Sequence, residues 1–368
     1  MLAGMGLLRL EGEKNSVSTR WKQRPPGSTW GDWGDDDELG RINLLTAEKV
    51  LEGVREVEAG VSFCLSLPLD YPGGTALNQR RQPPVLAPTE DMQGSPGRFY
   101  NVHMSQMNEW GDARYVDVWA DDVVTLSLQY STQWDSLAHV GAEFDADRDG
   151  SEEPVYYNGY RGGVDLVGPQ PDARGDGGPH QCFAHHLGLE HMAFHGVQGR
   201  GVLVDLAHHL GQDWRGVDRK TLEEIMSADH VVVEPGDMLL LHTGFATQVL
   251  RWERRPDPVK IHRMGSYLDA RDPSLLEWIR ESQIAALVAD NYAVEGLLGR
   301  DPDERRHSFL PIHHLCLFRL GVPLGEMWYL HELATWLREH ERSRFLLTAP
   351  PLRLPGAVGS PLTPVATV

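Results

Sequence analysis

The feature that most constrains the fold of this chain is a series of short apolar runs separated by segments with helix signals. The runs are GVLVDLA at 201–207, GDMLLLHTG at 236–244 and AALVADN at 285–291. We interpret each run as a strand. Helices are expected between them, at about 218–228 and 273–281. Strands that alternate with helices indicate an α/β fold.

Other elements are predicted on either side of these runs. Thr46 is the expected N-cap of a helix in TAEKVLEGVREVEAG, which Gly60 ends. In DVVTLSLQ at 122–129, apolar and polar residues alternate as in a half-buried strand, which would place Gln129 at its polar-face end. A helix around LHELATWLREHE and a proline-rich tail complete the sequence.

Length and composition suit a globular protein with ample material for a core. The chain has 368 residues, of which 41% are hydrophobic. We expect residues 1–28 to be a loosely ordered N-terminal segment and residues 29–368 to form a single domain. Residues 73–115 are irregular and rich in Gly, Pro, Gln and Arg, so they are either a functional lid or pocket wall or a surface excursion without a role.

Charge and cysteine usage exclude several function classes. The formal net charge of −19 argues against binding to nucleic acid or to a membrane surface. Cys64, Cys182 and Cys316 form no C-x-x-C motif, which suits a reducing cytoplasm. No apolar run approaches the roughly 20 residues of a membrane span, and the opening residues do not fit a signal peptide. We therefore expect a soluble, cytoplasmic protein whose partner is a small molecule.

The segment LQYSTQWDSLAH, residues 128–139, carries residue types suited to chemistry. Asp135 and His139 can move protons or bind metal, whereas Gln129 and Gln133 offer neutral amides. Plainer interpretations exist as well. Asp135 could be the N-cap of a helix, and His139 could be a structural histidine.

Segments along most of the chain match one known family. They are WGDDDELGRINLLTAEKV, GLEHMAFHGVQGRGVLVDLA, EPGDMLLLHTGFA, VADNYAVEGL and PIHHLCLFRLGVPLGEMWYLHELA. Over about residues 28–366 the chain resembles the cyclase family that includes bacterial kynurenine formamidase and isatin hydrolase. The resemblance implies a swivelling β/α/β fold with a mixed sheet flanked by helices, a homodimer or higher homo-oligomer, and a divalent metal site used to hydrolyse amides or cyclic amides.

The resemblance also implies roles for individual residues. The family's loop H-x-G-T-H-x-D-x-P-x-H corresponds to residues 129–139. By position, Asp135 is implied as a metal ligand and His139 as the catalytic acid/base. Glu326 matches a late ligand glutamate, and its histidine partner is either His313 or His314.

The chain departs from the family pattern at Gln129 and Gln133, which replace two ligand histidines. A neutral amide is a weaker zinc ligand than an imidazole and is better suited to harder ions. One interpretation is an attenuated site for a single divalent ion, Mn or Zn. The other is a metal-free site in which the two amides donate hydrogen bonds to a carbonyl or oxyanion.

Further residues are candidates for binding the substrate. Trp134 is either a pocket wall or part of the core. Asp290, Asn291 and Glu295 follow a strand end and either line the site or brace it. The full set of substrate-binding candidates is Trp134, Thr132, Tyr130, Asp290 and Asn291. The histidines between 185 and 195 are interpreted as surface or structural residues.

These observations predict a small-molecule hydrolase or cyclase that acts on an amide, lactam, lactone or related carbonyl compound. Two alternatives stay open. The first is a metal-independent cyclase, dehydratase or isomerase that uses His139 and a carboxylate to move protons. The second is a non-catalytic small-molecule-binding protein.

Overall fold

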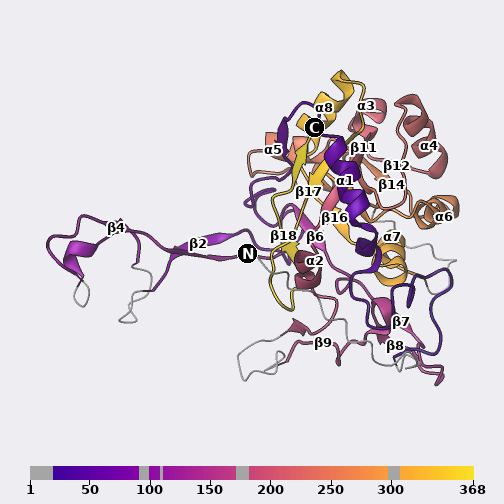
Figure 1. Cartoon of the computed structure of the whole chain (residues 1–368), viewed down its shortest axis with the longest axis horizontal. Coiled ribbons are helices and arrows are strands. Elements are labelled where there is room, and N and C mark those ends of the chain that lie inside the picture. The colour runs from indigo at the N-terminus through magenta and orange to yellow at the C-terminus, as the bar shows by residue number, and fades with distance from the viewer. Residues whose placement is uncertain (1–19, 91–98, 108–110, 171–181, 297–306) are drawn as a thin grey trace, which may run out of the picture.

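A mixed nine-stranded sheet forms the centre of the computed structural model, as Figure 1 shows. The structure describes residues 20–90, 99–107, 111–170, 182–296 and 307–368. The strand order is β1-β19-β17-β11-β13-β15-β16-β6-β18. Neighbours from β11 to β16 run parallel, and the other pairs are antiparallel. In sheet order the strands are Ser62–Cys64, Val365–Thr367, Arg344–Thr348, Gln198–Asp205, Met238–His242, Ala286–Ala289, Leu324–Glu326, Gln133–Asp135 and Gly359–Pro361. The predicted α/β fold is confirmed.

The helices begin close to where their sequence signals place them, although the helix that was expected to run up to Gly60 ends at Arg55. Thr46 caps α1 (Ala47–Arg55), because its side chain accepts a hydrogen bond from the N–H of Lys49. Helices α4 (Arg219–Ala228) and α6 (Pro273–Glu281) occupy the two predicted intervals between parallel strands. The remaining helical segments are η1 Gly40–Leu44, η2 Met104–Gln106, η3 Tyr157–Gly159, α2 Leu189–His195, α3 Leu206–Leu210, α5 Phe245–Arg251, η4 Lys260–His262, α7 Pro311–His313, η5 His314–Leu320 and α8 His331–Glu339.

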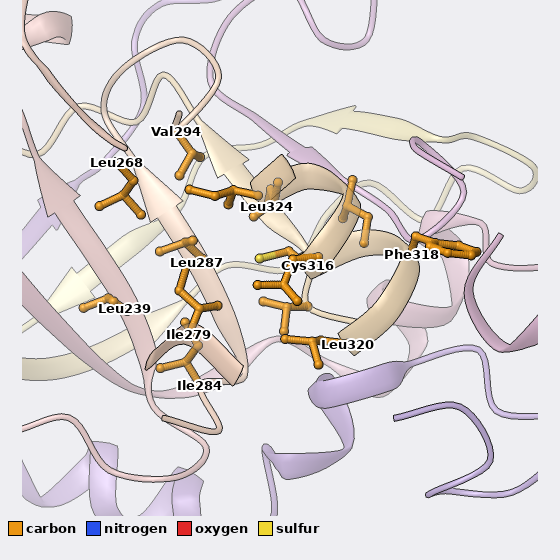
Figure 2. Close-up of a cluster of buried hydrophobic side chains, with 14 of the residues drawn as sticks. Leu239, Leu268, Ile279, Ile284, Leu287, Val294, Cys316, Phe318, Leu320 and Leu324 are labelled. Carbon is orange, nitrogen blue, oxygen red and sulfur yellow. The ribbon is translucent and has the colours of Figure 1, made fainter. Parts of the chain in front are cut away.

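Two hydrophobic cores cover the two faces of the sheet. Because side chains alternate along a strand, Val202 and Val204 of β11 join one core, with residues of α4, α6 and η5, while Leu203 joins the other, with residues of α2 and α8. Figure 2 shows part of the first core, where Leu287 of β15 meets side chains of α6 and η5. The parallel strands are therefore buried on both faces, which explains the continuous apolar runs within them.

A long arm projects away from the body of the molecule (Figure 1). It is built on the pair of β2 (Val85–Pro88) and β5 (Asp122–Thr125), with β3 (Val102–His103) and β4 (Val118–Trp119) further out. The strand predicted over 122–129 is thus shorter and lies outside the central sheet. Its four residues are all exposed, so the alternation of apolar and polar residues does not mark a buried face here.

The remaining strands form three small two-stranded sheets. They are β7 Ala142–Phe144 with β8 Glu153–Val155, β9 Leu166–Val167 with β10 Phe183–Ala184, and β12 Arg215–Val217 with β14 Ser266–Leu268. Among the described residues, no helix combines the length and apolarity that crossing a membrane requires.

Both ends of the described chain pack on the body. We expected loose order up to residue 28, but Trp21 contacts Trp30 edge to face at 6.2 Å, and the N–H of Lys22 donates to the carbonyl of Ala146. Residues 1–19 lie outside the described residues. The proline-rich tail forms β18 and β19 within the chain's own sheet.

Candidate active site

The ends of β6 and β16 bring three polar side chains onto one face of the sheet. These strands pair so that Gln133 lies opposite Glu326 and Trp134 lies opposite Gly325. Because side chains alternate, Gln133 and Asp135 share the face that Glu326 occupies, whereas Trp134 points to the opposite face. All three polar side chains are buried. Asp135 ends a strand and is followed by a turn, so it is not a helix N-cap.

The amide of Gln133 ties the two carboxylates together. Its Nε2 donates to Glu326 Oε2 at 3.0 Å and approaches the two oxygens of Asp135 at 3.2 and 3.3 Å. An amide hydrogen-bonded in this way fills a role that a carboxylate could not, because two buried carboxylates repel each other. Gln133 is therefore part of the cluster itself.

His313 completes the buried cluster, and Glu295 orients it. The imidazole Nε2 lies 3.2 Å from Glu326 Oε1, and Nδ1 lies 2.8 Å from Glu295 Oε1. Glu295 also accepts hydrogen bonds from the backbone N–H groups of Ile312 and His313. His314 points elsewhere: its ring packs on Phe318, with centroids 5.0 Å apart. Of the two candidate histidines, the structure therefore brings His313 into the site.

His139 stands at the edge of this cluster. Its Nε2 lies 3.9 Å from Asp135 Oδ1, and its Nδ1 lies 3.5 Å from the amide nitrogen of Gln129. Gln129 packs over Gly359, where a Cβ atom would come within 2.1 Å of the amide nitrogen. Glycine at 359 therefore leaves the room that Gln129 needs to reach His139.

Arg81 is a member of the site that the sequence did not reveal. It comes from the base of the arm, and its Nη1 donates to the carbonyl of Gln129 at 2.6 Å and lies 3.4 Å from Gln133 Oε1. Its guanidinium lies 5.6 Å from the centroid of the Tyr292 ring. No motif marked Arg81, because it is brought to the cluster only by the course of the chain between residues 72 and 82.

Burial and neighbouring charges shift the pKa values of the cluster, and they often act in opposite directions on the same group. Burial raises the pKa of Asp135, which the charge of His139 opposes and the charge of Glu326 reinforces. Burial also penalises ionised Glu326, but the hydrogen bond and charge of His313, together with the charges of Arg81 and His139, outweigh burial and lower the pKa of Glu326. For His313, burial is outweighed by hydrogen bonds to Glu295 and Glu326, which raise its pKa to about 10. Burial, with the charge of Arg319, lowers the pKa of His314 to about 4.

Three residues of the cluster fit a divalent ion. Asp135, His313 and Glu326 each offer one ligand atom, and these atoms lie within 4.8 Å of one another. Glu295 binds Nδ1 of His313 and so directs Nε2 into the site, the arrangement by which carboxylates orient metal-binding histidines. Two carboxylate oxygens and one imidazole nitrogen are suitable ligands for Mn or Zn.

Two of the predicted substrate-binding residues of the loop, Trp134 and Thr132, are buried and make hydrogen bonds within the protein. Trp134 is fully buried, donates from Nε1 to the carbonyl of Ala349 at 2.8 Å, and packs edge to face on Trp328. Thr132 is also buried, and its hydroxyl donates to the carbonyl of Met327 at 2.6 Å. Both side chains therefore lie in the interior.

Tyr130 remains beside the site. Its hydroxyl donates to the carbonyl of Gly74 at 2.8 Å. With Arg81, Asn78 and Tyr292 it lines a small hollow next to the cluster.

Asp290 and Asn291 brace the strand ends. Asp290 is fully buried and accepts hydrogen bonds from the N–H and hydroxyl of Thr243, each at 2.6 Å, and from the N–H of Gly244 at 2.9 Å. The amide of Asn291 donates to the carbonyl of Ser266 at 2.9 Å. The neighbouring Glu295 is the residue of this segment that reaches the cluster.

Two of the four histidines between 185 and 195 share an acidic partner that the sequence did not indicate. Glu38, from the acidic loop near the N-terminus, lies 3.0 Å from both His186 Nδ1 and His191 Nε2. The contact fastens this loop to α2, and it lies outside the cluster around Asp135.

Comparisons with known proteins agree with this fold. The family model described as "Putative cyclase" matches residues 65–296. A crystal structure of a novel cyclase is 30% identical, with 94% of this chain and 100% of that chain covered and a TM-score of 0.70. Isatin hydrolase A from Labrenzia aggregata, bound to benzyl benzoate, has a similar fold at 13% identity, with 84% and 93% of the two chains covered and a TM-score of 0.51.

No curated protein matches the chain. The family model covers more than half of the sequence, and the novel cyclase aligns over nearly all of it. The chain therefore belongs to the cyclase family and is an enzyme of that family.

Proposed function

We propose that this enzyme hydrolyses or cyclises a small amide, lactam, lactone or related carbonyl compound, with His139 as general acid/base. The observation that carries the proposal is that His139 is more exposed to solvent than the other groups of the cluster. The side chain of His139 is 24% exposed, whereas those of Asp135, His313 and Glu326 are at most 3% exposed. A substrate can therefore contact His139 directly, while the other three groups lie deeper in the protein.

The surroundings of His139 suit proton transfer. Asp135, 3.9 Å away, stabilises the imidazolium that forms when His139 accepts a proton. The amide of Gln129 lies on the other side of the ring, at Nδ1. Since that contact is 3.5 Å long, it fixes the ring only loosely, and a substrate atom can replace it.

Asp135, His313 and Glu326 would hold one divalent ion, Mn or Zn. Bound there, the ion would polarise the substrate carbonyl and lower the pKa of a water molecule. Arg81 adds a positive charge on the same side of the cluster, near Gln133. It can stabilise the negative charge that develops on a carbonyl oxygen during attack. Gln133 keeps the two carboxylates in place.

A second candidate is a metal-independent cyclase, dehydratase or isomerase. The observation in its favour is that Gln133 Nε2 donates to both Asp135 and Glu326, so the two carboxylates already have a shared partner. In that case the pair of His139 and Asp135 would move protons without an activated water molecule.

Substitution of His139 tests the proposal. We expect His139→Ala to lower kcat by about 10²–10⁴-fold, the usual contribution of a general acid/base, while the thermal unfolding curve is unchanged. Turnover is measured on a panel of small amides, lactams (isatin among them) and lactones. His195→Ala, at the exposed end of α2, is the matched control. Full activity of the His139 variant on a compound that the wild type converts would contradict the assignment.

Chelation distinguishes the two candidates. Activity that a strong chelator removes and Mn or Zn restores supports the hydrolase with a divalent ion. Activity that survives complete chelation supports the metal-independent enzyme.

A further inference from the structure

A second cavity lies between helix α5 and the small sheet of β12 and β14. It has a volume of about 240 Å³. One wall is a single face of α5 together with its C-cap residue Trp252. Gln248 follows Phe245 by three residues and precedes Trp252 by four, so the three side chains lie on the same side of the helix. The cavity contains none of the residues of the cluster around Asp135. Its lining is Gln212, Gly244, Phe245, Gln248, Trp252, Lys260, Arg263, Met264 and Gly265.

The floor of the cavity is formed by backbone. Gly244 and Gly265 both have positive φ, at 83° and 73°, which favours glycine. The N–H of Gly265 donates to the carbonyl of Gln212 at 2.8 Å, and the N–H of Gly244 donates to the buried carboxylate of Asp290 at 2.9 Å. The floor is therefore held rigidly by hydrogen bonds.

Two cations, Lys260 and Arg263, stand beside the cavity. Lys260 and Arg263 are both exposed, and neither forms an ion pair with any carboxylate in the described ranges. Asp257 accepts hydrogen bonds from the backbone N–H groups of Lys260 and Val259, and these bonds, with a smaller contribution from the charge of Lys260, lower the pKa of Asp257. The charges of Lys260 and Arg263 lie next to each other on a chain with 53 acidic and 34 basic residues. They give this cavity a local positive charge on an acidic protein.

We propose that this cavity is a second small-molecule site and that it binds an aromatic carboxylate. Phe245, Trp252 and Met264 supply an apolar surface for a ring. Lys260 and Arg263 supply charged donors for a carboxylate at the mouth. The volume is smaller than that of a site for a drug-sized ligand, which is roughly 300–1,000 Å³, so the ligand has about one ring. The binding does not depend on the function proposed for the Asp135 cluster.

Isothermal titration calorimetry with benzoate as the probe tests the proposal on the full-length protein. We expect saturable benzoate binding to the wild type and binding at least about tenfold weaker to the Lys260→Gln/Arg263→Gln variant, because hydrogen bonds between charged groups are lost. Benzamide, the neutral analogue, should bind at least about tenfold more weakly than benzoate for the same reason. Quenching of tryptophan fluorescence by benzoate should be reduced in Trp252→Phe.

Two controls make the outcome decisive. Arg219→Gln/Lys220→Gln removes the same charge from the exposed face of α4 and should leave benzoate affinity unchanged. Arg81→Gln reports binding at the cluster around Asp135. The proposal is overturned if benzoate does not bind the wild type. It is also overturned if affinity falls in the Arg81 variant while the Lys260/Arg263 variant binds normally.

Discussion

At the scale of single residues, the site is organised by groups that support one another in pairs. His139 has Asp135, His313 has Glu295, and Gln133 joins Asp135 to Glu326. Gln133 therefore places a hydrogen-bond donor between two carboxylates. The sequence drew attention to Gln133, but it could not show which atoms the amide contacts.

Glu295 allows a test at this scale. In the metal-free protein, Glu295→Gln removes a carboxylate that helps to raise the pKa of His313 to about 10, so that pKa should fall. NMR titration of the His313 ring measures the change. The same substitution should weaken binding of Mn or Zn by about 10–100-fold, the usual effect of losing the partner of a ligand histidine.

The matched control for this test is Glu281→Gln, at the exposed end of α6. The pKa of His313 and the metal affinity of this variant should equal those of the wild type. An unchanged His313 pKa in Glu295→Gln would show that Glu295 does not control this histidine.

At the scale of elements, the sequence predicted best where local signals and burial agree. The strands β11, β13 and β15 contain the continuous apolar runs 202–204, 238–241 and 286–289 because both faces are covered there, and α4 and α6 begin at capping aspartates. The sequence was misleading at β5, because its alternation is typical of a half-buried strand although the strand is exposed. Asp135 was ambiguous for a similar reason, because aspartate is suited both to a strand end and to a helix N-cap, and SLAH at 136–139 is compatible with a turn or a helix.

The ends of β11 and β13 carry a buried pair with a predictable pH dependence. His242 Nδ1 lies 2.7 Å from Asp205 Oδ1. Burial disfavours the charged imidazole, but the hydrogen bond to Asp205 and the charge of Asp290 outweigh it and raise the pKa of His242 above 6.5. The stabilisation is therefore complete below the unfolded pKa of about 6.5 and is lost as the pH rises through the higher folded pKa.

Urea unfolding at several pH values tests this pair. The free energy of unfolding of His242→Gln should be lower than that of the wild type by about 1.5–3 kcal/mol at pH 6, the range for hydrogen bonds to charged groups. The difference should shrink as the pH rises to 9. His195→Gln should show no such trend. A difference for His242→Gln that stays constant from pH 6 to pH 9 would contradict a charged His242.

At the scale of the whole molecule, the arm is the feature whose apolar side chains the body of the protein leaves uncovered. Leu86 and Val124 pair directly across β2 and β5, and they are 71% and 44% exposed. Val85 and Val123, on the other face, are exposed as well. An isolated two-stranded ribbon is marginally stable in water, so a ribbon with apolar side chains on both faces needs a cover. We propose that a second copy of the chain supplies it, in a homodimer or higher homo-oligomer.

Sedimentation velocity tests the oligomer. The wild type should sediment as a dimer or larger species, and Leu86→Glu/Val124→Lys should shift it toward the monomer. The two new charges are opposite in sign and face each other, so they preserve the ribbon while making its surface polar. Val259→Glu, at a position on the body that is 69% exposed, is the control. A monomeric wild type would contradict the proposal.

The metal content of the protein tests the central claim most directly. We would purify wild-type protein without chelator, incubate it with Mn or Zn, remove free ions, and measure metal per chain by elemental analysis. The account predicts about one ion per chain in the wild type and a large loss in His313→Ala, with His314→Ala close to the wild type. Absence of bound metal after incubation, or equal metal content in the His313 and wild-type proteins, would contradict it and favour the metal-independent enzyme.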